Sequence, residues 1–206
     1  MARRQDGGGV NARPKLKENI MTSRAWAAVA FTVYVAAIAL SNWLIVHVGI
    51  PAGPGVHLTP VGFGLLAPSG VWAAAVSFPA RDVTQRLGGR RLGVAAILVG
   101  AGISYLISSP VIAVASGVTY LCSEGADMAV YTPLQRRWFV PAVFASGCVA
   151  IVVDSVLFLH LAGLYSVASL EGLVLGKFWV ILAAVPVTWA LRNRGPMAVP
   201  AEAVPA

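Results

Sequence analysis

Long apolar stretches, separated by short polar ones, make up most of the chain. Six can be traced, with ends placed to within about 2–4 residues: residues 25–48, 60–78, 92–107, 111–131, 138–162 and 173–191. An α-helix needs about 20 mostly apolar residues to cross the hydrocarbon core of a bilayer. The pattern therefore predicts an all-α integral membrane protein with six transmembrane helices. The third stretch is short and rich in Gly, and its pattern is the weakest.

The composition agrees with this class of protein. Of 206 residues, 58% are hydrophobic and only 11% are charged, and the mean hydropathy is +0.78. A soluble domain of this length could not cover so many apolar stretches. The first stretch exceeds the ~7–15 apolar residues of a secretory signal, and five more follow it. We expect one membrane domain at residues 25–191, between flexible cytoplasmic tails at residues 1–24 and 192–206.

Basic residues are distributed unevenly between the two sides of the predicted bundle. Fourteen of the 15 Lys and Arg residues lie before the first stretch, after the second, after the fourth or after the last. The loops on the opposite side carry none. The positive-inside rule then places both termini in the cytoplasm, with the chain in the cell (inner) membrane. Anionic lipid at the inner surface accounts for the net charge of +7, so no nucleic-acid partner is expected.

Three helices followed by three more would place the two halves in opposite orientations. This is the topology of an inverted repeat, although no sequence similarity between the halves is visible. Small residues occur in every stretch and would let the helices approach closely. Two inverted three-helix halves and a homo-oligomer are both compatible with the sequence.

Few ionisable or amide side chains interrupt the apolar stretches. Such groups are costly in a membrane and usually face the bundle interior or a water-filled path, which makes eight residues candidates for substrate binding: Asn42, Arg81, Asp82, Gln85, Glu124, Asp127, Asp154 and Lys177. A rise of about 1.5 Å per helical residue places Asn42, Asp154 and Lys177 toward the external side. It places Glu124 and Asp127 toward the internal side, so two polar layers are expected.

Opposite charges are expected to pair within each layer. Asp154 and Lys177 lie at similar depth and could neutralise each other. Asp127 could meet Arg81, which would leave Glu124 as the least neutralised acid.

Purely structural roles are the alternative for the same residues. Asp154 and Lys177 could be a structural pair, Lys177 could extend to the membrane surface, and Arg81 with Asp82 could cap a cytoplasmic helix end. No nucleophile elbow, phosphate loop or dinucleotide fingerprint occurs, and the two cysteines lack metal-ligand spacing. We therefore expect no enzyme activity, no metal and no cofactor.

Several motifs together resemble one transporter family. They are SNWLI at residues 41–45, TPVGF at 59–63, FPARDVTQRLGGRR at 78–91, SEGADMAVYTPLQRR at 123–137, VVDSVLFLHLAG at 152–163 and GK at 176–177. In this order and spacing the chain resembles the queuosine-precursor transporter family, also called the vitamin uptake transporter (VUT) family, over residues 25–191. Family members often carry Asn after the serine of the fifth helix, where this chain has Gly147 after Ser146.

The resemblance implies import of a 7-deazaguanine, such as 7-cyano-7-deazaguanine, with the eight polar residues named above matching the polar pattern of the family. A guanine-like base presents an N–H and an amine side by side, and one carboxylate can accept both hydrogen bonds. We expect Glu124 to be that acceptor, with Asn42 and Gln85 as amides for other base edges.

Other functions fit the same sequence. The family is similar in size and helix number to the vitamin-binding S-components of energy-coupling-factor transporters, which need an ATPase partner. A structural or assembly protein would bind no ligand at all. Proton coupling, coupling to another ion and facilitated transport are all compatible with the buried acids.

Overall fold

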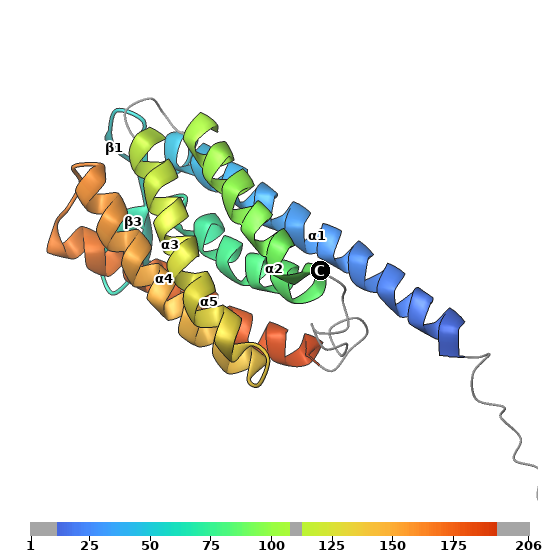
Figure 1. Cartoon of the computed structure of the whole chain (residues 1–206). Coiled ribbons are helices and arrows are strands. Elements are labelled where there is room, and N and C mark those ends of the chain that lie inside the picture. Colours follow the sequence, from blue (N-terminus) through green and yellow to red (C-terminus); the bar gives the residue numbers. More distant parts are fainter. Residues whose placement is uncertain (1–11, 108–112, 193–206) are drawn as a thin grey trace, which may run out of the picture.

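The computed structural model describes residues 12–107 and 113–192. This part of the chain forms a helical bundle with a small antiparallel sheet at one end (Figure 1). The helices are α1 Ala12–His47, α2 Val71–Ile107, α3 Ala113–Leu134, α4 Phe139–Leu161 and α5 Val167–Leu191, and the strands are β1 Ile50–Gly53, β2 Val56–Gly62 and β3 Leu65–Pro68.

Four of these helices are long and apolar enough to cross a membrane. They are α1 from Met21 onward, α2, α4 and α5. Helix α3, which carries Glu124 and Asp127, is not among them. The chain is thus a mostly helical protein with the character of a membrane protein.

The predicted N-terminal tail is partly helical. Helix α1 begins at Ala12, so residues 12–24 do not belong to a flexible tail as expected. The segment contains Lys, Glu, Leu and Met, which are good helix formers, and it follows the last of the N-terminal glycines. The rest of that predicted tail, and the C-terminal tail after residue 192, lie outside the described residues.

The prediction of a membrane helix at residues 60–78 is wrong in its first half. Residues 60–62 end strand β2, residues 63–64 form a turn, residues 65–68 are strand β3, and the helix begins only at Val71. The strand order is β1-β2-β3, with Thr59 paired to Ala67. Gly and Pro disfavour a helix interior and favour turns, but a hydropathy average does not register this effect. The segment contains five such residues: Pro60, Gly62, Gly64, Pro68 and Gly70.

Helix α2 is two helical segments that reverse direction at Gly89. This glycine has φ 84° and ψ 170°, a conformation that residues with a side chain rarely adopt. A Cβ atom on Gly93 would lie 2.9 Å from the Gln85 side chain, whereas a straight helix would separate the two residues by about 12 Å. The second segment therefore runs back beside the first (Figure 1), and it corresponds to the stretch predicted at residues 92–107.

The sheet is packed onto α4 and α5. Val61 and Ala67 of the sheet form a buried cluster with Val71, Leu159 and Leu173. Close contact between α5 and strand β3 requires glycine, since a Cβ atom on Gly172 would lie 2.1 Å from the carbonyl oxygen of Leu66. The sheet thereby closes one end of the bundle.

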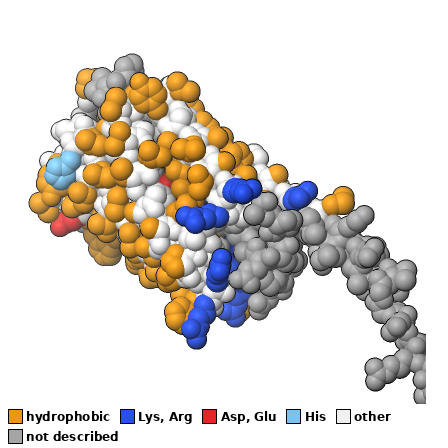
Figure 2. Space-filling view, in the orientation of Figure 1, with side chains coloured by type: hydrophobic (Ala, Val, Ile, Leu, Met, Phe, Trp, Pro, Cys, Tyr) orange, Lys and Arg blue, Asp and Glu red, His pale blue; other side chains and the backbone are white. Residues whose placement is uncertain are grey.

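Lys and Arg side chains gather at the opposite end of the molecule (Figure 2). Exposed pairs flank the reversal of α2 and the α3–α4 connection, and one more arginine follows α5: Arg90, Arg91, Arg136, Arg137 and Arg192. Arg81, which the sequence placed with these loop residues, is instead fully buried inside α2.

Candidate functional site

A buried arginine on α2 is the centre of the inner polar layer. Arg81 Nε donates to Glu124 Oε2 at 2.9 Å, and Arg81 Nη2 forms an ion pair with Asp127. Both acids lie on α3, three residues apart and therefore on one helix face. All three side chains have 0% exposure. The predicted pairing of Asp127 with Arg81 is confirmed.

Two further α2 side chains complete this cluster. Asp82 Oδ1 lies 3.1 Å from Arg81 Nη1, which also donates to Gln85 Oε1 at 3.2 Å. The amide of Gln85 donates in turn to the Thr132 hydroxyl at 3.1 Å on α3. The Ser146 hydroxyl of α4 donates weakly to Asp82 Oδ2 at 3.4 Å. We call Arg81, Asp82, Gln85, Glu124 and Asp127 the inner cluster.

One expectation and one alternative for the inner cluster are wrong. Glu124 is not the least neutralised acid of its layer, because Arg81 binds it directly as it binds Asp127. Arg81 and Asp82 do not cap a helix end at the surface, because both are inside α2 and at most 1% exposed. The sequence could not show that the guanidinium reaches two acids on another helix at once.

The outer polar layer borders a cavity of about 90 Å³. One enclosed water needs roughly 10–15 Å³ on this measure, so the space accommodates several waters or a small organic molecule. Helices α1, α2, α3, α4 and α5 all contribute to its wall, and Pro68 of strand β3 also lines it. The expected outer-layer residues Asn42, Asp154 and Lys177 all line it.

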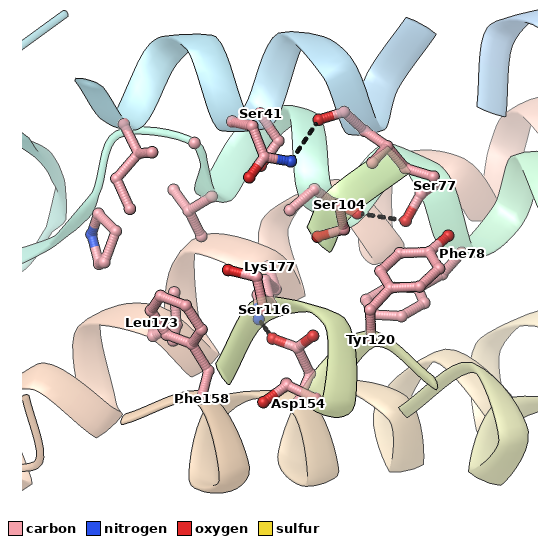
Figure 3. A pocket seen from close by; sticks show the side chains of 18 residues that line it. Ser41, Ser77, Phe78, Ser104, Ser116, Tyr120, Asp154, Phe158, Leu173 and Lys177 are labelled. Atoms are coloured by element: carbon pink, nitrogen blue, oxygen red, sulfur yellow. Dashed lines mark hydrogen bonds and ion pairs between the residues drawn. The ribbon is translucent and has the colours of Figure 1, made fainter. Parts of the chain in front are cut away.

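An ion pair lies on one wall of this cavity. Lys177 Nζ of α5 donates to Asp154 Oδ2 of α4, as predicted from their depth. The other oxygen, Asp154 Oδ1, accepts a bond from the Ser123 hydroxyl at 3.4 Å. Figure 3 shows the pair facing Ser41 of α1 across the space. Asn42, next in sequence, donates to the Ile38 carbonyl at 2.9 Å.

Aromatic side chains form the ends of the cavity. Tyr120 and Phe78 lie together at one end, and Phe158 lies beside Leu173 toward the other (Figure 3). Ser77, Ser104 and Ser116 also line the cavity. The wall therefore combines apolar faces with a few polar groups, as small-molecule sites commonly do.

Tyr120 was not among the predicted site residues, and it connects the two layers. It lines the cavity and lies four residues before Glu124 on α3. Its hydroxyl faces the Glu124 carboxylate without a hydrogen bond of good geometry. The i, i+4 spacing to Glu124 was a signal available in the sequence, because such residues share a helix face.

The eight predicted residues therefore divide into two groups. Five form the inner cluster, and three line the cavity. Glu124, Asp127 and Gln85 are not among the cavity residues, so the structure does not bring all eight together around one space.

No family model, no curated protein and no solved structure matches this chain. The resemblance to the queuosine-precursor transporter family therefore stays a prediction drawn from the motifs.

Proposed function

We propose that this chain is a multi-pass inner-membrane importer of a 7-deazaguanine queuosine precursor, with both termini in the cytoplasm. The motif resemblance suggests the substrate class. Five helices with a reversal at Gly89 in α2 are compatible with six membrane crossings. The basic end in Figure 2 would face the cytoplasm.

The observation that carries this proposal is the cavity between the helices, with its ion pair and aromatic ends. A planar heterocycle can stack on Tyr120, Phe78 or Phe158. Asp154 can accept from the adjacent N–H and amine of a guanine-like edge, and the carboxylate is already oriented by Lys177 and Ser123. Asn42 and the serines are further polar contacts on the opposite side.

This assignment moves the base-reading role from Glu124 to Asp154. An acceptor carboxylate must be close to the ligand, and Glu124 is 0% exposed and does not line the cavity. Asp154 is 17% exposed and borders the cavity. A small ligand could therefore reach Asp154 without opening the inner cluster.

The test is binding of labelled 7-cyano-7-deazaguanine to the purified protein in nanodiscs. The double variant Asp154→Asn, Lys177→Gln removes both charges of the pair together and should weaken binding about 10–100-fold, the scale of a charge-assisted hydrogen bond. Glu124→Gln and the exposed Glu171→Gln should bind as the unchanged protein does. Absence of binding by the unchanged, folded protein would overturn the proposal.

Uptake into sealed vesicles then separates an importer from an S-component. Accumulation or exchange of the labelled base without any ATPase subunit is expected for an importer. Tight binding with no uptake would instead identify a subunit that needs an energy-coupling partner.

A further inference from the structure

The inner cluster contains more negative than positive charge. One guanidinium, Arg81, contacts three carboxyl groups, so full ionisation would leave one positive and three negative charges in side chains that are at most 1% exposed. Uncompensated buried charge is strongly unfavourable. The ion pair of Lys177 and Asp154 next to it is already neutral. A bound proton would reduce this excess.

Glu124 has an oxygen available for such a proton. Its Oε2 accepts from Arg81, whereas Oε1 is buried and has no hydrogen-bond partner. The Tyr120 hydroxyl faces this carboxylate and also the Tyr34 hydroxyl, is buried, and makes no hydrogen bond of good geometry. Tyr120 as a whole is 9% exposed. A phenol can donate to an ionised carboxylate and accept from a protonated one, so it suits both states of Glu124.

The other two acids of the cluster contact Arg81 as Glu124 does. Asp127 forms an ion pair with Arg81 Nη2, and its Oδ1 is buried without a hydrogen-bond partner, as Glu124 Oε1 is. Asp82 contacts Arg81 Nη1 and accepts from Ser146. Glu124 is distinguished by Tyr120, a residue of the cavity wall whose hydroxyl faces the Glu124 carboxylate.

We propose that Glu124 is a proton-binding site that exchanges with the cavity through Tyr120. In uptake, the Tyr120 hydroxyl gives its proton to the Glu124 carboxylate and takes one from cavity water, so the O–H bond of the phenol is broken and formed again and Tyr120 stays neutral. Glu124 becomes the neutral acid, and release is the reverse of this exchange. Its use to drive uptake rests on the function proposed above, whereas proton binding itself does not.

Every element packed around Glu124 contributes groups that influence this proton. The titratable and charged ones that act on it are Tyr34 of α1, Arg81 and Asp82 of α2, Tyr120 of α3 and Asp154 of α4. Asp127 of α3 shares Arg81 with Glu124, and Lys177 of α5 pairs with Asp154. Arg81 favours the ionised acid, and Asp82, Asp127 and Asp154 favour the protonated one. Lys177 is neutralised by Asp154.

Infrared difference spectroscopy of the ligand-free protein in nanodiscs tests proton binding directly. Between acid and alkaline buffer, the unchanged protein should show the C=O band of a buried protonated carboxyl group. The band should disappear in Glu124→Gln and persist in the control Glu171→Gln, whose acid is exposed. A band that persists in Glu124→Gln, or no band in the unchanged protein, would overturn the proposal.

A second variant covers the case in which Glu124→Gln does not fold. Tyr120→Phe keeps the ring and removes the hydroxyl, so the band should remain but shift in frequency because the acid loses its phenol partner. An unshifted band would contradict the route through Tyr120.

Transport in proteoliposomes tests coupling separately. With 7-cyano-7-deazaguanine as the probe, an inward gradient of one pH unit should raise accumulation up to about tenfold for one coupled proton. Glu124→Gln should keep substrate exchange at equal pH but lose this stimulation. Exchange by the unchanged protein without any effect of the gradient would refute coupling alone, whereas absence of exchange would refute the proposed function and leave the infrared result standing.

Discussion

Lys177 and Asp154 form an ion pair whose two ends are unequally exposed. Lys177 is 2% exposed and Asp154 is 17% exposed. Asp154 also keeps the Ser123 hydroxyl as a second partner. Removal of the Asp154 carboxylate therefore leaves the deeply buried Lys177 charge without its partner. Removal of the Lys177 amine leaves only the partly exposed Asp154 charge, which keeps Ser123 as a partner.

We predict that Asp154→Asn destabilises the protein more than Lys177→Gln. Breaking a buried ion pair by removing one partner costs about 3–5 kcal/mol in general, and the partial exposure of Asp154 should keep the Lys177→Gln value at or below the lower end. The double variant should regain part of the loss, because it strands neither charge. Thermal unfolding in detergent measures all three, with Glu171→Gln as the control. Additive losses would show that the pair is not coupled.

For single residues, the sequence predicted the depth of polar side chains in the bundle better than it predicted which charges pair. The depth argument correctly paired Asp154 with Lys177, since each has only one opposite charge nearby. It failed for Glu124, because one guanidinium has five N–H donors and can serve several acids at once. Tyr120 was missed although it lies four residues before Glu124 on the same helix face, because an aromatic residue on an apolar helix more often belongs to the core.

Among the elements, the three-stranded sheet depends on close approach to α5. A Cβ atom on Gly172 would overlap the Leu66 carbonyl oxygen, and backbone cannot move aside as a flexible side chain can. Trp179 of α5 also donates to the Val61 carbonyl at 3.1 Å. The sheet and the outer part of α5 therefore form one packed unit beside the cavity.

We predict that Gly172→Ala lowers stability by about 1–3 kcal/mol, the usual cost of overpacking. Gly102→Ala is the matched control, since a Cβ atom there meets nothing within 4 Å and Ala is the better helix former. The control should be neutral or slightly stabilising. Thermal unfolding of both variants in the same detergent decides the matter, and equal behaviour would mean that the sheet is not docked on α5 as described.

The sequence predicted helices better than it predicted their ends. The long apolar stretches located α1, α4 and α5, although α1 and α5 begin earlier than predicted. They failed at residues 60–68, where an equally apolar segment forms strands because its glycines and prolines permit turns. The reversal at Gly89 lies in a Gly-Gly pair that precedes Arg90 and Arg91. Adjacent glycines followed by two charged residues indicate a turn at this position.

For the whole molecule, the ends of the bundle differ in charge. The sheet and the α4–α5 connection lie at one end, and the exposed arginines lie at the other (Figures 1 and 2). Electrostatic interaction with anionic inner-leaflet lipid favours placing the arginine-rich end in the cytoplasm. The orientation proposed above follows from this asymmetry, and exposed residues at both ends provide reporters.

Single cysteines in a background lacking Cys122 and Cys148 should reveal the orientation. We predict that Ala52→Cys in strand β1 and Ala168→Cys at the start of α5, both exposed, react with an impermeant thiol reagent added to intact cells. Arg91→Cys, exposed beside the reversal of α2, should react only after the membrane is opened, which also controls for reactivity. Labelling of Arg91→Cys in intact cells, with Ala52→Cys and Ala168→Cys protected, would mean that the basic end faces outward. That result would reverse the direction in which the proposed importer and its proton site work, because the cavity, which lies toward the sheet, would then open to the cytoplasm.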